Sequence, residues 1–275
     1  MILTELSSKK SFSNMSSDLL KKIEHVLTPF ERLGLNDFGD GRFAERRDRK
    51  FPCHINQITE VVKGLQDHYD LITPNDDSIS AIGTLYFDTP DYDFFQAHHR
   101  GKGNRLKVRF RKYPDTQTSF LEVKKKSIKG LTLKERVLSP FESNAISEKM
   151  RAFLEENGIK TSIPLKPVLE VNYRRFSFIS KDRVERFSID FEVEFSNPDG
   201  KGNFGDLAII EVKQPSLKTT PVIKKLRENR IREASLSKYC LSLSTLIPKL
   251  KSNRFKPALR SLQAFFHEHI SKSTA

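Results

Sequence analysis

The chain has 275 residues, 37% of them hydrophobic, and a formal net charge of +13 at pH 7. This length and hydrophobic content allow a buried core in one large or two small domains, and the excess of cations favours a polyanionic partner: nucleic acid, an acidic membrane surface or phosphate. Two distant cysteines, Cys53 and Cys240, give neither a disulfide framework nor a zinc motif, and the lack of a roughly 18-residue apolar run or a signal core predicts a soluble cytoplasmic protein.

The first part of the chain is predicted to be helical, with interruptions. Residues 1–16 are rich in Ser and are predicted to be frayed, after which apolar residues at helical spacing predict a helix over 17–33. A turn-rich break follows at 36–41. A second apolar stripe at helical spacing then predicts a helix over 55–69.

After a loop at 74–78, polar and apolar residues alternate, which predicts strands for most of the remaining chain. The predicted strands are 80–88, 104–113, 119–126, 131–137, 168–179, 183–195 and 207–212. Predicted helices interrupt or follow them at 91–99, 143–157, 221–232, 236–246 and 256–270. Seven or more strands with one polar face favour an α+β fold, a closed antiparallel β-barrel with a polar interior, flanked by helices at both ends of the chain.

The segment RLKVRFR places a cation at every second position: Arg105, Lys107, Arg109 and Arg111. Successive side chains of a strand point to opposite faces, so all four cations project from one side. Like charges so close together repel one another unless a dense anion lies opposite them. A chain of phosphates is the best chemical match.

Several other predicted strands alternate carboxylates and cations with apolar residues. The alternating polar positions are Arg186, Ser188, Asp190, Glu192 and Glu194; Glu122, Lys124 and Lys126; Glu170, Asn172 and Arg174; and Glu211 and Lys213. An ordinary sheet with one face in water explains any single strand of this kind. Shared placement over four or five strands favours a common site, in which cations bind phosphate oxygens and carboxylates hold a divalent metal.

Nine blocks along the chain resemble the bacterial VTC (vacuolar transporter chaperone) domain, in the order of that family. The blocks are RDRKF at 47–51, LYFDTPDYDFF at 85–95, HHRGKGNRLKVRFRKY at 98–113, FLEVKKK at 120–126, LKER at 133–136, ERFSIDFEVEF at 185–195, IIEVKQ at 209–214, SKYC at 237–240 and NRFKPALR at 253–260. The resemblance implies membership of the triphosphate tunnel metalloenzyme (CYTH-like) superfamily, whose fold is an antiparallel β-barrel open at both ends. The eukaryotic members of the VTC family polymerise inorganic polyphosphate from the γ-phosphate of ATP with a divalent metal, usually manganese.

The resemblance also implies roles for individual residues. The implied catalytic cations are Lys50, Lys107, Arg109, Lys124 and Arg174. The implied substrate-binding residues are Arg49, Arg105, Arg111, Lys126, Lys134, Arg136, Arg186, Lys213 and Lys238. The implied ligand of Mn²⁺ or Mg²⁺ is Glu211, with Asp190, Glu192 and Glu122 as further candidates. The family often has arginine where this chain has Lys107, and lysine keeps the charge without the bidentate contact.

Two features near the first strands have structural interpretations. Asp88 is interpreted as the cap of the helix that follows Pro90. The adjacent His98 and His99 point about 100° apart on a helix, so they are poorly placed to chelate one metal.

Three functions remain open from the sequence. The first is a polyphosphate polymerase-like phosphotransferase that uses ATP and a pyrophosphate or polyphosphate acceptor, with a membrane-protein partner that eukaryotic relatives suggest at the inner face of the membrane. The second is a metal-dependent triphosphatase or tripolyphosphatase, and the third is a non-catalytic polyphosphate-binding module. Carboxylates among the cations count against a pure binder, and nucleic acid is a weaker rival because the cations lie on strands with apolar neighbours. The predicted division is a tail and helix over 1–40, a catalytic domain over 41–260 and a helix end and tail over 261–275.

Overall fold

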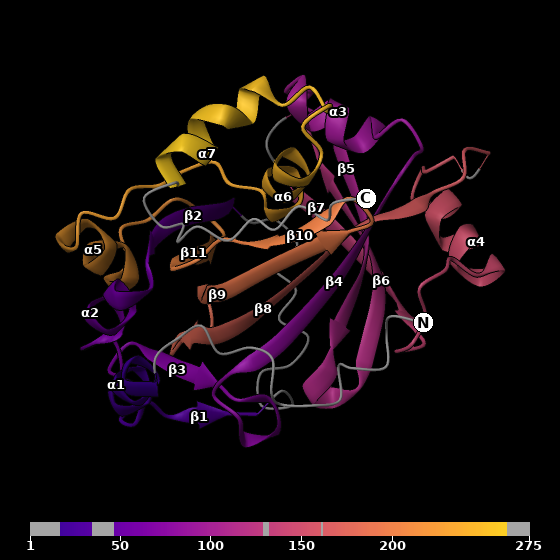
Figure 1. The fold of residues 1–275 in the computed structure, drawn as a ribbon. Helices are drawn as coiled ribbons and strands as arrows, with labels where there is room; N and C mark the ends of the chain where they lie inside the picture. The colour runs from indigo at the N-terminus through magenta and orange to yellow at the C-terminus, as the bar shows by residue number, and fades with distance from the viewer. Residues whose placement is uncertain (1–16, 35–46, 129–131, 161, 263–275) are drawn as a thin grey trace.

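The computed structural model describes residues 17–34, 47–128, 132–160 and 162–262 (Figure 1). The predicted frayed segment 1–16, the break at 36–41, the first residue of the strand predicted at 131–137 and the part of the last helix beyond residue 262 lie outside these ranges. Among the described residues, no helix is both long enough and apolar enough to span a membrane.

One curled sheet dominates the described part of the chain, and its main path runs in the order β2-β11-β9-β8-β4-β5-β6-β7 with antiparallel neighbours. These strands are β2 (Arg47–His54), β4 (Ser80–Asp88), β5 (Arg105–Tyr113), β6 (Thr118–Lys126), β7 (Thr132–Ser139), β8 (Lys166–Ser180), β9 (Arg186–Asn197) and β11 (Leu207–Gln214). Three short strands extend it: β1 (Arg32–Leu33) pairs in parallel with β3 (Tyr69–Ile72), β3 pairs with β8, and β10 (Gly200–Asn203) pairs with β9.

The sheet curls strongly, so that it has an inner and an outer face. Lys124 on β6 lies 2.8 Å from Asp48 on β2, although five strands separate β6 from β2 along the path. Only a sheet that curls around this face permits such a contact, and we call it the inner face. The predicted α+β class and antiparallel curled sheet are confirmed, whereas closure into a barrel is not shown, because no ladder joins β7 to β2 among the described residues.

Helices cover both faces of the sheet. The helices are α1 (Ser17–Leu27), α2 (Ile58–Val62), α3 (Asp93–His99), α4 (Glu148–Glu156), α5 (Pro221–Glu228), α6 (Lys238–Leu246) and α7 (Lys256–Leu262), with short 3-10 turns at η1 (Ile55–Gln57), η2 (Pro74–Asp76), η3 (Pro114–Thr116) and η4 (Asn253–Phe255). Apolar residues of α1, α2 and α5 pack on the outer face of β2, β11, β9 and β8, and α4 packs on the outer face of β5 and β6. Helices α6 and α7 join an apolar cluster that includes the inner-face residues Tyr86, Tyr173 and Ile209 (Figure 1).

Several predicted elements differ from the structure in length or type. The helix predicted over 17–33 ends at Leu27, just before Pro29, and the helix predicted over 55–69 ends at Val62, because Gly64 takes a φ of +80°. The fully buried Tyr69–Ile72 is strand β3. The pattern analysis also missed β2, which reads as a basic run, and the Gly-containing β10. The helices predicted over 143–157 and 221–232 are shorter, at Glu148–Glu156 and Pro221–Glu228.

A β-bulge between β8 and β9 decides which side chains reach the inner face. The register shifts between Asn172 and Arg174, and Glu192 on the facing strand has a φ of +48°. Beyond the shift, Arg175 pairs with Asp190. The extra residue of this bulge lies in β9, so it breaks the simple alternation on which the sequence interpretation of β9 depended, while β8 keeps its alternation.

Candidate functional site

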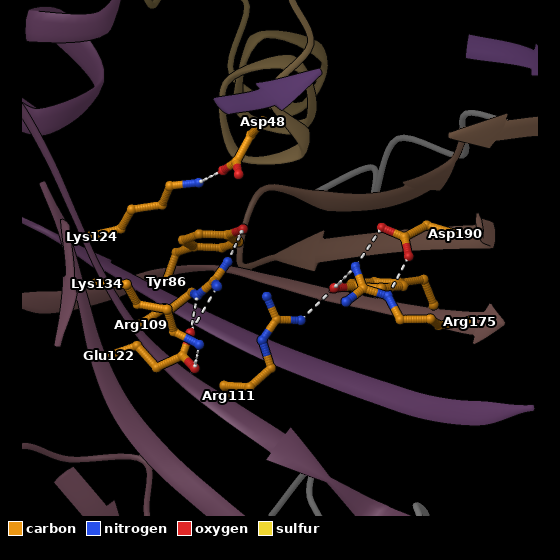
Figure 2. A network of polar contacts seen from close by, with 10 residues as sticks. Asp48, Tyr86, Arg109, Arg111, Glu122, Lys124, Lys134, Arg175 and Asp190 are labelled. Carbon is orange, nitrogen blue, oxygen red and sulfur yellow. Dashed lines mark hydrogen bonds and ion pairs between the residues drawn. The ribbon is translucent and has the colours of Figure 1, made fainter. Parts of the chain in front are cut away.

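Two arginine–carboxylate groups lie on the inner face, and the first joins β5, β6 and β7. Arg109 donates from Nε and Nη2 to Oε2 of Glu122 at 2.9 and 2.7 Å, and Lys134 Nζ lies 2.5 Å from Oε1 (Figure 2). Glu122 is fully buried. Burial raises its pKa, but the charges of Arg109 and Lys134 outweigh burial and hold the pKa well below its usual range. Burial lowers the pKa of Lys134 to about 8.

The second group joins β8, β9 and α6 around Asp190. Arg175 donates from Nε and Nη2 to the two carboxylate oxygens at 2.5 and 2.9 Å (Figure 2). Lys238 also donates to this carboxylate. The ring of Tyr173 lies 5.4 Å from the guanidinium of Arg175 and 4.4 Å from Nζ of Lys238, and its hydroxyl accepts from Arg111. Burial raises the pKa of Asp190, but Arg175 and Lys238 lower it further than burial raises it.

Between these groups, β2, β11 and β6 bring together a mixed set of charges. Glu211 pairs in register with Lys50 and with Ser188, and Lys124 forms its ion pair with Asp48. Among the described residues, none makes a hydrogen bond or a direct ion pair within 4 Å with Glu211. Burial raises its pKa, but the charges of Lys213, Lys50 and Lys124 hold it well below the usual range, so the carboxylate is ionised and surrounded by cations.

Three buried or half-buried cations of the inner face have neutral hydrogen-bond partners. Lys50 Nζ donates to the carbonyl of Leu236 at 3.0 Å, and Lys107 Nζ donates to the hydroxyl of Ser237 at 2.9 Å. Arg111 donates to the Tyr173 hydroxyl. Burial, followed by the charges of Lys50 and Lys124, lowers the pKa of Lys107 to about 7. No carboxylate is hydrogen-bonded to these three groups, so an anion can pair with their charged forms.

Most of the sequence-predicted site residues share the inner face. By strand register they are Lys50, Arg105, Lys107, Arg109, Arg111, Glu122, Lys124, Lys126, Lys134, Arg136, Arg186, Asp190, Glu211 and Lys213, and Lys238 reaches the same face from α6. Arg136 lies at the exposed edge, with its guanidinium 4.5 Å from the Phe120 ring centroid.

Three predicted residues lie away from this face. Strand β8 pairs with β4 in unbroken register from Ser80 to Tyr86, and its regular alternation places Arg174 on the outer face. There Nη1 of Arg174 lies 3.3 Å from Oε2 of Glu192, and the guanidinium lies over the outer-face Phe191 ring. Glu192 is therefore not placed with Asp190. Arg49 alternates with Lys50 on β2, so it points to the outer face and pairs with Glu233 at 2.8 Å.

The sequence analysis did not identify four residues that form ion pairs or hydrogen bonds in the site. Arg175 directly follows the predicted Arg174, and the regular alternation of β8 places the two on opposite faces. Asp48 stands two residues before Lys50, so the same alternation would have placed it on the inner face if β2 had been recognised as a strand. Tyr173 and Ser237 had no sequence signal for a hydrogen bond to a cation. The predicted capping role of Asp88 is confirmed, since its carboxylate accepts from the backbone N–H groups of residues 94 and 95 at 2.9 and 3.0 Å.

The carboxylates of the inner face differ in their fitness for a divalent metal. Glu122 and Asp190 are each neutralised by two cations, and within the described residues no group of three His, Cys, Asp or Glu side chains is placed to hold a metal ion. Glu211 lacks a direct partner there. A Mg²⁺-like ion often takes one or two protein carboxylates and completes its shell with phosphate oxygens and water. Glu211 fits that role, and the predicted ligands Glu122, Asp190 and Glu192 fit it poorly.

Comparisons with known proteins give a family match and several structural similarities. The family model described as VTC domain matches residues 45–247. The structure is similar to the PH1819 protein of Pyrococcus horikoshii OT3, at 15% identity over 72% of this chain and 98% of that chain, with a TM-score of 0.41. It is similar to the bh2851 protein of Bacillus halodurans, at 17% identity over 71% of this chain and 95% of that chain, with a TM-score of 0.45. It is also similar to HpAC1 of Hippeastrum, described as having a dominant triphosphatase activity, at 16% identity over 76% and 99%, with a TM-score of 0.43. No curated protein matches the chain.

Proposed function

The chain belongs to the VTC domain family, and from this premise we propose that it is a polyphosphate polymerase-like phosphotransferase. It moves the γ-phosphate of ATP onto a pyrophosphate or polyphosphate acceptor at the inner face of the sheet. A divalent metal, Mn²⁺ or Mg²⁺, accompanies the nucleotide. The membership of the family carries the fold and the general chemistry, and the activity itself is our proposal.

The observation that carries the proposal is the set of inner-face cations with neutral partners. Lys50, Lys107 and Arg111 donate to a carbonyl and two hydroxyls, so their charges remain available to an anion. Hydroxyls add to this set: Ser188 and Thr84 have buried Oγ atoms with no hydrogen-bond partner in the described part of the chain. Cations without a bonded carboxylate, and buried hydroxyls without a hydrogen-bond partner, are groups that can bind phosphate oxygens.

Phosphoryl transfer needs mainly positioning and charge stabilisation, which these residues supply without a covalent nucleophile. Lys50, Lys107 and Arg111 would neutralise the triphosphate, and Arg175 would do so while holding Asp190. Glu211 would hold the metal, which, when bound, shields the charge of the phosphates and favours attack on the γ-phosphorus. The acceptor phosphate oxygen attacks this phosphorus, the bond to the β-phosphate oxygen breaks, and ADP leaves.

The decisive experiment incubates purified protein with ATP and Mn²⁺, with and without pyrophosphate, and analyses the products by gel and phosphorus NMR. Wild-type protein is compared with Glu211→Gln and Lys124→Gln. Arg227→Gln on α5 is the matched control, because this exposed cation lies on the outer-face helix.

Each product identifies a different activity. Polymer from the wild type and from Arg227→Gln, but not from Glu211→Gln, supports the proposal. Free phosphate without polymer means that water is the acceptor and the protein is a triphosphatase. Intact ATP with tight tripolyphosphate binding means that the protein only binds the polyanion.

A further inference from the structure

Helix α3 carries two adjacent histidines that lie between two groups of cations. His98 is influenced by cations of the inner face. Burial, followed by the charges of Lys107 and Arg105, lowers the pKa of His98 to about 2. His99 is affected by a different group, since burial and the charges of Lys251 and Arg254 lower its pKa. Because neighbouring residues on a helix point about 100° apart, α3 has the inner cations on one side and a second, outer set on another.

Arg254, one of the cations near His99, is held by contacts between α3 and the turn η4. The backbone N–H of Arg254 donates to Nε2 of His99 at 3.5 Å, and the ring of Phe255 lies 5.9 Å from that of His99 and 5.5 Å from that of Phe95. The Arg254 guanidinium lies directly against Gly101, where Nη1 would be 1.8 Å from a Cβ atom. Figure 1 shows α3 and α7 at the same end of the sheet.

This surface has a strongly one-sided charge. Residues 239–262 contain no Asp or Glu and five cations: Lys249, Lys251, Arg254, Lys256 and Arg260. We define the outer patch as the exposed side chains of Arg100, Lys251 and Arg254. Within the described residues, none of these three has an ion-pair partner within 4 Å. Clustered cations without carboxylates repel one another unless a polyanion lies over them.

The inner group next to α3 has the same character. Arg105 lies at the end of the β5 row beside Lys126, and its buried Nε has no hydrogen-bond partner in the described part of the chain. No carboxylate of the Glu122 or Asp190 groups is bonded to Arg105 or to Lys107. Cations without a bonded carboxylate therefore lie on two sides of α3: Lys107 and Arg105 near His98, and the outer patch near His99.

We propose that the outer patch binds the part of a linear polyphosphate chain that extends beyond the inner face, so that one chain contacts both groups of cations. The inference rests on the proposed function, since it assumes that the inner face holds a tri- or polyphosphate. A linear chain with a charge on every phosphate unit is the anion that can reach cations on both sides of α3. A single small anion could occupy only one end of it.

The test measures the affinity of the protein for tripolyphosphate and for a long-chain polyphosphate by calorimetry, without ATP or metal. The variants are the triple Arg100→Gln/Lys251→Gln/Arg254→Gln and the double Arg100→Gln/Lys251→Gln, which leaves the Arg254 contacts with α3 intact. The control triple is Lys224→Gln/Arg227→Gln/Arg232→Gln, which removes the same charge from exposed positions on and after α5.

We expect the wild type to bind the long chain more tightly than tripolyphosphate. The outer-patch triple should lose about tenfold or more in affinity for the long chain at low salt, with a smaller salt dependence, because fewer counterions are released. Its affinity for tripolyphosphate, measured at about 0.15 M salt, should change by less than about twofold, since screening there weakens interactions between charges more than about 8 Å apart. The double variant should show an intermediate loss, and the control triple should bind both ligands like the wild type.

Other outcomes overturn the inference. If the wild type binds tripolyphosphate but binds the long chain no more tightly, the inner face is a phosphate site and the outer patch is not part of it. If both triple variants lower the affinity for the long chain equally, binding depends on the net charge of the protein and not on the outer patch. If the outer-patch triple loses binding to phosphatidylglycerol-containing vesicles but keeps its affinity for the long chain, the patch is a membrane-binding surface. If the wild type binds neither phosphate, the proposed function fails as well.

Discussion

Adjacent arginines on β8 occupy opposite environments, and their roles can be separated by experiment. Arg175 makes a bidentate contact with Asp190 on the inner face, whereas Arg174 pairs with Glu192 on the outer face. Both arginines are half-buried, and both have a carboxylate partner. Replacing each with lysine keeps the charge, so that the comparison isolates the planar, forked geometry of the guanidinium.

We predict that Arg175→Lys weakens tripolyphosphate binding about tenfold, because one charge-assisted hydrogen bond of about 1.5 kcal/mol is lost. Arg174→Lys should change the affinity by less than about twofold, as expected for a pair that does not face the ligand. Calorimetric titration of both variants checks this, with urea unfolding to confirm that each is folded. Equal losses in the two variants would contradict the assignment of Arg175, rather than Arg174, to the site.

Lys107 is an inner-face lysine whose charge state changes near neutral pH, as does that of Lys134 with its pKa of about 8. Its ammonium group lies among charged or titratable groups from four elements and a neighbouring position of its own strand. These groups are Lys50, Arg109, Lys124, Cys240 and His98. With a pKa lowered to about 7, Lys107 is largely charged below pH 7 and largely neutral above it in the free protein. A bound polyanion favours the charged form and so raises this pKa.

Tripolyphosphate binding at pH 8 should therefore take up protons, and the Lys107 contribution should approach one proton per site. At pH 6 this contribution should be small, because Lys107 is already charged before binding. Calorimetry in buffers with different ionisation enthalpies measures the uptake. Lys107→Arg, which stays charged at both pH values, serves as the reference, and the same uptake in this variant and in the wild type at pH 8 would refute the prediction.

At the scale of elements, helix α6 connects the two parts of the inner face. Its N-cap residue Ser237 accepts from the backbone N–H of Cys240 at 3.3 Å and from Lys107 at 2.9 Å. The next residue in the chain, Lys238, binds Asp190. The first turn of this helix thus fixes one cation from β5 and adds another to the β8–β9 group.

We predict that Ser237→Ala lowers the free energy of unfolding by about 1 kcal/mol, the usual effect of losing a helix N-cap. Ser244→Ala is the matched control, because Ser244 donates only to the carbonyl of Cys240 near the other end of α6. Its effect should be a few tenths of a kcal/mol. Urea unfolding monitored by circular dichroism compares the two. A loss in Ser244→Ala as large as that in Ser237→Ala would show that the cap is not the important contact.

What the sequence could predict depended on whether an element keeps its regular period. The row from Arg105 to Arg111 follows strict alternation, and all four cations lie on the predicted face. Alternation failed in β9, because a bulge with a left-handed Glu192 shifts the register there. Strand β8 alternates regularly, and Arg174 was assigned to the wrong one of its two faces. Alternation also failed at β2, where the basic residues and Pro52 give no apolar period, and pairing with β11 decides the structure instead.

At the scale of the whole molecule, long-range contacts rather than local patterns make the site. Asp48 and Lys124 are 76 residues apart in the sequence, and Lys107 and Ser237 are 130 apart. No local periodicity specifies these pairs. The curled sheet brings these residues together, and as a consequence it concentrates positive charge on one face. That concentration costs folding free energy in the absence of an anion, because like charges in a poorly hydrated site repel one another.

A bound polyanion should therefore stabilise the whole domain. At a free tripolyphosphate concentration of 100 times its dissociation constant, the expected gain in the free energy of unfolding is about 2.7 kcal/mol. For a domain of this size, such a gain raises the melting temperature by roughly 5 to 10 °C. Thermal unfolding is measured with tripolyphosphate and with sodium sulfate at matched ionic strength, in wild type and in Lys107→Gln/Lys124→Gln. The shift should be specific to tripolyphosphate and should largely disappear in the double variant. An equal shift with sulfate would mean that simple screening of the +13 charge, and not a defined site, accounts for the stabilisation.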